Sequence, residues 1–140
     1  MIKNILFASD FAQGTSNAER YTVHIARASS AKVTVIHAVE TIDGAGDDAA
    51  VERFVERKQT TARKQAETVA ARIRSEGLEA DVVVPIGTRW KAIIDHAKQG
   101  EYELVVIGAN AVQDGDKVYM GTTTQKVFFA ADMPLLVVPA

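Results

Sequence analysis

The chain has 140 residues, of which 47% are hydrophobic and 24% charged, a composition typical of a globular domain rather than a disordered chain. Its net charge of −2 argues against a nucleic-acid-binding surface. No apolar run is long enough to span a membrane. The absence of cysteine excludes disulfides, thiolate catalysis and cysteine-ligated zinc. We therefore expect one cytoplasmic domain over residues 1–140.

Short apolar runs alternate with longer amphipathic stretches along the chain. Ser16 and Glu19 have the spacing of a capping box, which indicates the start of the first helix. A polar connection at 43–48 leads into the longest helix, and Gly77 suits a left-handed stop at its end. The predicted strands are residues 5–8, 33–39, 80–86, 104–107 and 134–138. Apolar spacing predicts helices over 18–28, 51–73 and 90–97, and a fourth opens near Thr122.

Five strands alternating with four helices predict an α/β fold, in which a parallel sheet is joined by right-handed crossovers. Ligands of such sheets bind beyond the carboxyl ends of the strands. The candidate site therefore lies in the segments that follow the strands, namely 9–10, 38–40, 87–88 and 108–123. The residues from Gly108 to Met120 have no apolar periodicity and are predicted to form a loop; within it, 114–117 is either a flap or a solvated turn.

The start of the fourth helix is a candidate anion site. The N–H groups of Gly121, Thr122 and Thr123 would point ahead of the helix, whose positive end favours a phosphate. The alternative is that Thr122 and Gln125 only form a capping box. Asp10 is open to two interpretations as well: it contacts a ligand, or it starts the turn that follows the first strand.

The stretch Gly108-Ala109-Asn110-Ala111, followed by nine residues and Gly121-Thr122, resembles the nucleotide-binding signature of the universal stress protein family, which is G-x-x-G, nine residues, G-[S/T]. The resemblance covers essentially the whole chain, because 5–11 is similar to the first strand of the family with its terminal aspartate, and 134–139 to its closing strand. It implies a Rossmann-like sheet of order 3-2-1-4-5 with helices on both faces. It also implies a homodimer that pairs through residues 135–138.

In one branch of this family the resemblance implies ATP bound between strands 1 and 4. By position, Ala8, Ser9 and Asp10 would border the adenine and ribose, and Ala38 would give backbone contacts to the base. A Mg²⁺ ion would bridge phosphate oxygens, since the sequence shows no carboxylate cage for it.

The same resemblance assigns the phosphate end of the nucleotide. Gly108 and Ala109, together with Ala111, would line the ribose and phosphates. Gly121, Thr122 and Thr123 would cap the phosphate chain.

Ala111 departs from the motif, which has its second glycine there. If this position needs a positive φ, alanine costs roughly 1–2 kcal/mol, which would weaken binding about five- to thirtyfold. If φ is negative, little is lost. A branch of the family without the glycines does not bind ATP, but Gly108, Gly121 and Thr122 remain here.

Three functions follow from this pattern. The first is an ATP-binding stress-response regulator with no catalytic residues and slow hydrolysis at most. The second is an enzyme that hydrolyses ATP or transfers phosphoryl or adenylyl groups, for which Lys117 and Asp10 are the nearest candidates. The third is an interaction dimer without a ligand. His24, His37 and His96 have no metal-site spacing and are predicted to be structural, with His37 nearest the site.

Overall fold

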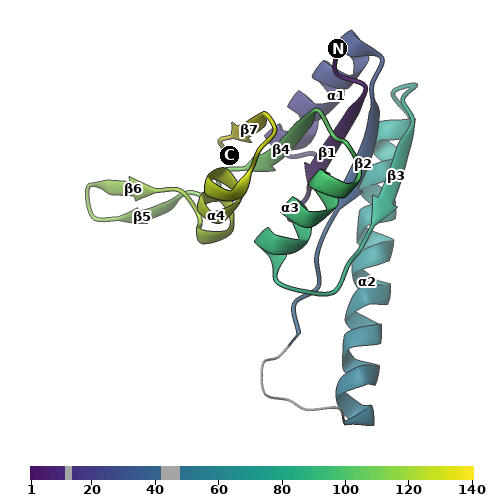
Figure 1. Cartoon of the computed structure of the whole chain (residues 1–140), viewed down its shortest axis with the longest axis vertical. Helices are drawn as coiled ribbons and strands as arrows, with labels where there is room; N and C mark the ends of the chain where they lie inside the picture. The colour runs from purple at the N-terminus through teal and green to yellow at the C-terminus, as the bar shows by residue number, and fades with distance from the viewer. Residues whose placement is uncertain (12–13, 42–47) are drawn as a thin grey trace.

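The computed structural model of the chain describes residues 1–11, 14–41 and 48–140, so most of the predicted connection at 43–48 lies outside the described residues. Five parallel strands form the central sheet in the order β3-β2-β1-β4-β7 (Figure 1). The strands are β1 (Asn4–Ala8), β2 (Lys32–Ile36), β3 (Ala80–Val83), β4 (Leu104–Gly108) and β7 (Leu135–Val138). With β7 as the fifth strand, this confirms the predicted order.

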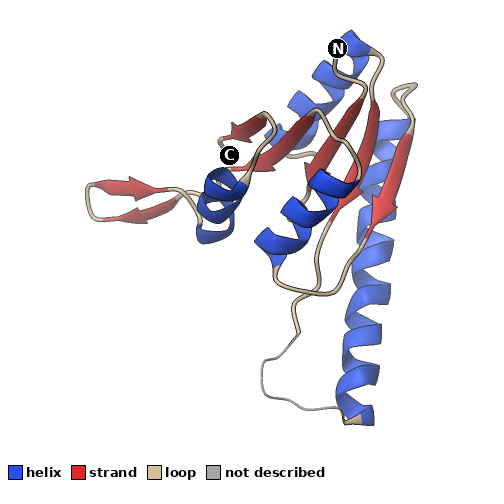
Figure 2. Cartoon of the chain, viewed as in Figure 1, coloured by secondary structure: helices blue, strands red, loops and turns tan. Residues whose placement is uncertain are grey.

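Helices cover both faces of the sheet, as expected (Figure 2). On one face, α1 (Asn17–Ser29) and α2 (Ala49–Arg74) pack on the side chains of Ile5 and Phe7. On the other, α3 (Arg89–Gln99) and α4 (Thr122–Ala130) pack on Leu6 and Ile36. Alternate residues of β1 thus enter opposite cores, as the period of a strand requires. Within the described residues, no helix combines the length and the apolar character needed to cross a membrane.

Only half of the predicted capping box forms at the start of α1. The hydroxyl of Ser16 accepts from the Glu19 N–H at 3.1 Å. The Glu19 carboxylate instead binds Arg72 of α2, with N–O distances of 2.7 and 3.0 Å. Glu19 is 4% exposed, and its hydrogen bond to Arg72 raises the pKa of that guanidinium. A residue predicted to act within one helix therefore joins two helices.

The first turns of α2 do not join the core, although the apolar stripe was predicted from Val51 onward. Val51 and Val55 are half-buried, Phe54 is 39% exposed, and full burial begins at Ala62. In Figure 1 this part of α2 runs past the carboxyl end of the sheet. It therefore stands beside the strand ends, where ligands of such folds bind.

The segment predicted as a loop from Gly108 to Met120 contains a β-hairpin, so that prediction is wrong. Strand β5 (Val112–Asp114) pairs antiparallel with β6 (Lys117–Tyr119). Gly115, with φ of 61°, begins the two-residue turn between them, a position that favours glycine. The residues 114–117 are therefore the end of a hairpin. Strands of three residues are too short to show a clear alternation of apolar and polar side chains, which explains the error.

Strands β2 and β3 end earlier than predicted, but their pairing continues in an irregular form. Pro85 has no N–H and interrupts the ladder. Its carbonyl accepts from the Val39 N–H at 2.9 Å, and the Gly87 N–H donates to the Val39 carbonyl at 2.9 Å. The segment from His37 to Glu40 is therefore held beside the sheet without being a regular strand.

The ion pair between α1 and α2, in which Glu19 is buried and the Arg72 side chain is 35% exposed, is expected to contribute more stability than a pair exposed on both sides. We predict that Glu19→Gln lowers the free energy of unfolding by about 1–3 kcal/mol, because the Arg72 guanidinium loses its charged partner. The matched control is Glu67→Gln, which removes the ion pair with Arg74 whose side chains are 51% and 44% exposed. That change is expected to cost about 0.5 kcal/mol or less. Urea unfolding of both variants measures the difference, and equal costs would contradict the prediction.

Candidate functional site

A small cavity lies at the carboxyl ends of β1 and β2. Five of the predicted site residues line this cavity of about 120 Å³: Ala8, Ser9, Asp10, Ala38 and Thr123. Its apolar wall comes from Ile36, Ile93 and Ile107. The Ser9 N–H donates to the Ile36 carbonyl at 3.1 Å and ties the end of β1 to β2. The structure therefore brings the predicted adenine side of the site together with one threonine of α4.

A second cavity of about 120 Å³ lies between β1, β4 and the start of α1. Gly108 and Ala109 line it, and it shares Ala8, Asp10 and Asn110 with the first cavity. The two hollows thus meet around the end of β1, which has β2 on one side and β4 on the other. This is the switch point at which ligands bind in open α/β sheets.

The backbone of the Gly108–Gly121 region closes on itself. The Gly121 N–H donates to the Ala109 carbonyl at 3.0 Å, and the Thr124 hydroxyl donates to the Gly108 carbonyl at 2.8 Å. A Cβ at Gly121 would lie 2.9 Å from both the Cβ and the carbonyl oxygen of Asn110, so this close approach requires glycine. Because the Gly121 N–H is engaged here, the amides that face forward from α4 are those of the threonines that follow.

The alternative capping box at the start of α4 does not form. Gly121 is the N-cap residue, and no side chain caps this end of the helix. Gln125 donates its side-chain amide to the Met120 carbonyl at 2.6 Å instead. The amides of Thr122 and Thr123 therefore have no side-chain cap, and they retain the positive end of the helix dipole.

The structure answers the question raised by Ala111. The residue with positive φ is its neighbour Asn110, at 48°, whereas Ala111 has no positive φ. Asparagine is one of the residues that tolerate this conformation best. Alanine therefore imposes no backbone strain at 111. Ala111 and Thr122 are both exposed and line neither of the two small cavities.

Two residues outside the predicted set, His37 and Arg89, also line the first cavity. The His37 Nδ1 lies 2.8 Å from the Ser9 carbonyl oxygen, and its ring centroid lies 4.1 Å from that of Phe11. Burial lowers the pKa of His37 below its ordinary value of 6.5, and the Arg89 cation lowers it further, while the bond to Ser9 and the charge of Asp10 oppose this. His37 directly follows β2 and Arg89 is the first residue of α3, next to the predicted segment 87–88, and this position near the carboxyl ends of strands was the signal that could have placed them in the site.

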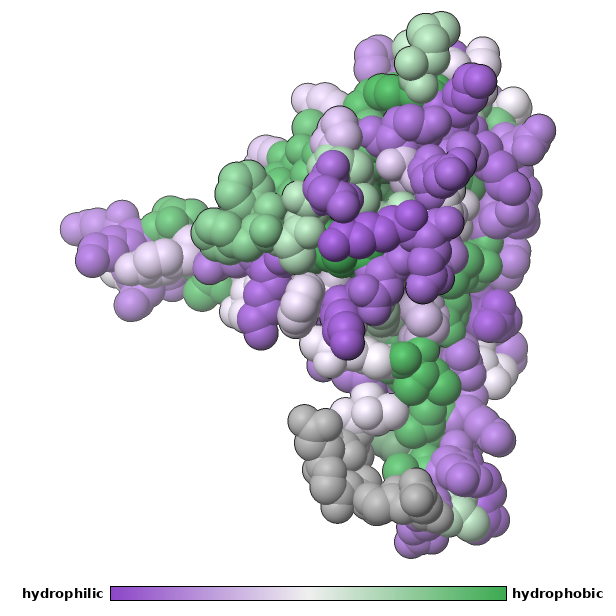
Figure 3. All heavy atoms as spheres, viewed as in Figure 1, coloured by the Kyte–Doolittle hydropathy of each residue, from purple (hydrophilic) through white to green (hydrophobic). Residues whose placement is uncertain are grey.

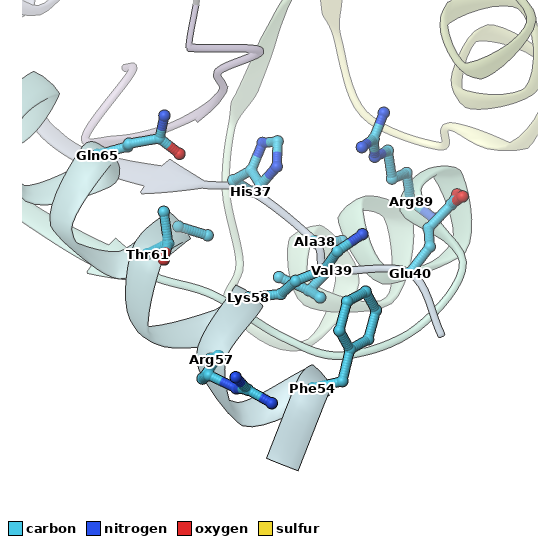
Figure 4. Close-up of a pocket in the computed structure, with 11 residues that line it drawn as sticks. His37, Ala38, Val39, Glu40, Phe54, Arg57, Lys58, Thr61, Gln65 and Arg89 are labelled. Carbon is cyan, nitrogen blue, oxygen red and sulfur yellow. The ribbon is translucent and has the colours of Figure 1, made fainter. Parts of the chain in front are cut away.

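A larger cavity of about 600 Å³ lies between the end of β2, α2 and the start of α3 (Figure 4). His37, Ala38 and Arg89 line both this cavity and the first one. Arg57 and Lys58 of α2 add two cations to its wall. In the described part of the chain, three cationic side chains, those of Arg57, Lys58 and Arg89, thus line this cavity. The glycine motif alone did not indicate them.

The charges around His37 make its titration a site-specific probe. We predict that Arg89→Met raises the pKa of His37 and that Asp10→Asn lowers it, because the two charges act in opposite directions. The pKa of His96 is lowered by burial alone and should not move in either variant. NMR titration of the imidazole C–H signals measures the pKa values of His37 and His96 in the original protein and in both variants. If the pKa of His37 moved in neither variant, the influence of Arg89 and Asp10 on it would be contradicted.

The lowered pKa of His37 also fixes a sign for stability. Below pH 6.5 His37 binds a proton in the unfolded chain but stays neutral in the folded protein until the pH reaches its lower folded-state pKa. The stability that the folded state gains from a neutral His37 is therefore fully present above pH 6.5. It is lost as the pH falls from 6.5 through the pKa of the folded state. The free energy of unfolding should therefore decrease over that interval, and less so in a His37→Gln variant.

Comparison with known proteins gives consistent matches over the full chain. The model of the universal stress protein family matches residues 1–139. Universal stress protein YxiE of Bacillus subtilis is 22% identical, over 99% of both chains. The solved structure of UspA from Lactobacillus plantarum has 23% identity and a TM-score of 0.80, over 98% of this chain and 97% of that one.

A universal stress protein from Archaeoglobus fulgidus, solved in complex with dAMP, has 22% identity and a TM-score of 0.70, over 98% of both chains. At this identity the solved structures show a shared fold. The family match covers nearly every residue, and it coincides with the strand order and with the spacing of Gly108 and Gly121. The chain belongs to the universal stress protein family.

Proposed function

We propose that this protein binds ATP or another adenine nucleotide and acts in the cytoplasm as a stress-response regulator with little or no catalysis. The observation that carries the proposal is the pair of cavities around Ala8 and Asp10, one of which reaches Thr123 of α4 and the other Gly108. A universal stress protein of similar fold was solved with dAMP, an adenine nucleotide, which supports the same ligand class.

The base would lie in the first cavity, against Ala38 and Ile93. The N–H groups of His37 and Val39 both donate towards β3 and its extension, to the carbonyls of Val83 and Pro85. Because backbone groups alternate along a strand, the N–H and carbonyl of Ala38 point to the opposite side, that of β1. One donor and one acceptor match the Watson–Crick edge of adenine, whereas guanine presents the reverse pattern.

The phosphates would extend past Asp10 towards Gly108 and the first turn of α4. The uncapped amides there supply positive charge without a lysine, and Arg89 adds a cation near the base end. A Mg²⁺ ion would bind through the phosphate oxygens, as Mg²⁺ does in many nucleotide complexes.

The size of the cavities implies that binding rearranges the site. Each cavity has about 120 Å³, below the roughly 300–1,000 Å³ of most ligand pockets. Asn110 lines both of them and is exposed, so we expect its displacement to join the two hollows.

Calorimetric titration tests the nucleotide site. We expect ATP with Mg²⁺ to bind saturably at one site per chain, and GTP to bind at least about tenfold more weakly because it mismatches the Ala38 backbone. Gly108→Val should abolish binding without unfolding the protein, since an added Cβ meets its first neighbour, Asn110 Oδ1, at 3.7 Å and the larger side chain fills the second cavity.

Gly108→Ala serves as the matched control, with an intermediate loss of affinity. Phosphate release, measured in the same samples, should stay near the uncatalysed rate. The proposal fails if no nucleotide binds saturably up to millimolar concentration, or if Gly108→Val binds as the original protein does.

We also propose that the protein forms a homodimer through residues 135–138. Strand β7 pairs with β4 on one side and is the last strand of the described sheet. Leu135, Leu136 and Val137 are only half-buried there. An apolar edge strand is an aggregation hazard unless something covers it, and antiparallel pairing with a second β7 would do so.

A proline scan along β7 tests this interface. The Pro134 and Val138 carbonyls accept from β4, so the parallel ladder directs the N–H of Leu136 towards β4 and that of Val137 away from it. Val137→Pro should therefore give a folded monomer, whereas Leu136→Pro should unfold the sheet edge. Sedimentation and circular dichroism measure both effects, and a Val137→Pro protein that dimerises normally would exclude pairing through β7.

A further inference from the structure

Among the described residues, no helix or other strand covers the hairpin β5–β6. Every residue of both strands is exposed, from Val112 to Asp114 and from Lys117 to Tyr119. In Figure 1 the hairpin extends away from the sheet, beyond the edge formed by β7. A two-stranded hairpin alone is at best marginally stable in water, so a contact outside the chain is expected to support it.

Both faces of the hairpin carry apolar side chains. Val112 pairs with Tyr119 on one face, and they are 56% and 45% exposed. Val118 points to the other face, opposite Gln113, and is 67% exposed. A hairpin that packs on the core of its own chain needs apolar side chains on one face only. A hairpin surrounded by water needs no apolar face. Apolar side chains on both faces indicate an arm that is enclosed by another molecule.

The apolar surface continues from the hairpin onto α4. Phe128 and Phe129 are 57% and 82% exposed, with ring centroids 5.4 Å apart, and Met120 at the base of the hairpin is 37% exposed. Figure 3 shows apolar surface over α4 and towards the base of the hairpin in this view, whereas the tip of the hairpin is hydrophilic. Taken with the three side chains of the hairpin, these residues present on the order of 600 Å², against about 800 Å² per partner in a standard interface.

We propose that the hairpin is a clasp that lies across a second copy of this chain. The inference rests on the proposed dimer through β7, because a two-fold axis at that edge puts each hairpin, which extends past the edge, against the partner. In such an isologous interface both protomers contribute the same patch, so a single chain carries the arm and the surface it needs. The hairpin and α4 together with the β7 edge then supply an interface of ordinary size.

The clasp would connect the interface with the nucleotide site. The hairpin is inserted between Asn110 and Gly121, and the bond from the Gly121 N–H to the Ala109 carbonyl closes its base. Asn110 also lines both small cavities. Docking of the arm on a partner therefore restrains the residue that must move for a nucleotide to fill both hollows.

Sedimentation equilibrium of three proteins tests the clasp. Val118→Asp places a charge on the exposed arm and should raise the dimer dissociation constant at least about tenfold. Ile86→Asp is the matched control, because Ile86 is 48% exposed and follows β3, at the opposite edge of the sheet from β7. It should dimerise as the original protein does. Both substitutions are at exposed positions, and circular dichroism confirms the fold.

The outcomes separate the clasp from the dimer itself. If Val118→Asp dimerises as tightly as the original protein, the clasp is excluded and pairing through β7 stands. If the original protein stays monomeric up to hundreds of micromolar, both are excluded and the apolar surface belongs to a different partner. Equal losses in Val118→Asp and Ile86→Asp would also overturn the clasp.

Hydrogen exchange gives a second readout. In the dimer, the amides of 112–119 should exchange more slowly than in the monomeric Val137→Pro variant, because docking stabilises the hairpin. Exchange of the hairpin at the same rate in monomer and dimer would overturn the proposal, even if Val118→Asp weakened the dimer.

Discussion

The pairing of β1 on both of its edges is the constraint on which the site depends. Strand β1 runs parallel to β2 and to β4, and the chain leaves its carboxyl end between them. The crevice around Ala8 and Asp10 lies at this point, so its position follows from the strand order. The ladder continues into the Ser9 N–H, which donates to the Ile36 carbonyl. The carboxyl end of β1 is therefore held in place by the sheet.

Residues with small side chains stand at the centre of this crevice, at the ends of β1, β2 and β4. Ala8, Ala38 and Gly108 leave space and expose backbone. Such a site can form backbone hydrogen bonds with a ligand and bind an anion at the start of a helix. It offers few side chains that could act as nucleophile, acid or base in a reaction. Asp10 lines both small cavities, whereas Arg89 and the partly buried His37 line only the first, in which we propose that the base lies. The lining therefore supports the proposed nucleotide-binding role more than a catalytic one.

The sequence predicted the sheet because long apolar runs and amphipathic spacing are local patterns, and it predicted the glycine frame from the resemblance of 108–122 to a known motif. What it missed depends on non-local contacts. The Glu19 carboxylate turns to Arg72, which is 53 residues away, and the Gly121 N–H is engaged by Ala109. The hairpin was missed because its strands are short, although Gly115 at a turn position between β-branched residues was a usable signal.

A nucleotide regulates a protein only if it binds two conformations with unequal affinity. In the proposed mechanism Asn110 supplies such a difference, because it lines both small cavities and also begins the segment that leads to the hairpin. If the clasp holds Asn110 in place, dimerisation and nucleotide binding affect each other by the same factor, since a coupling free energy is reciprocal. Through this coupling, nucleotide binding would change the affinity of one chain for its partner even though the site has no strong catalytic groups.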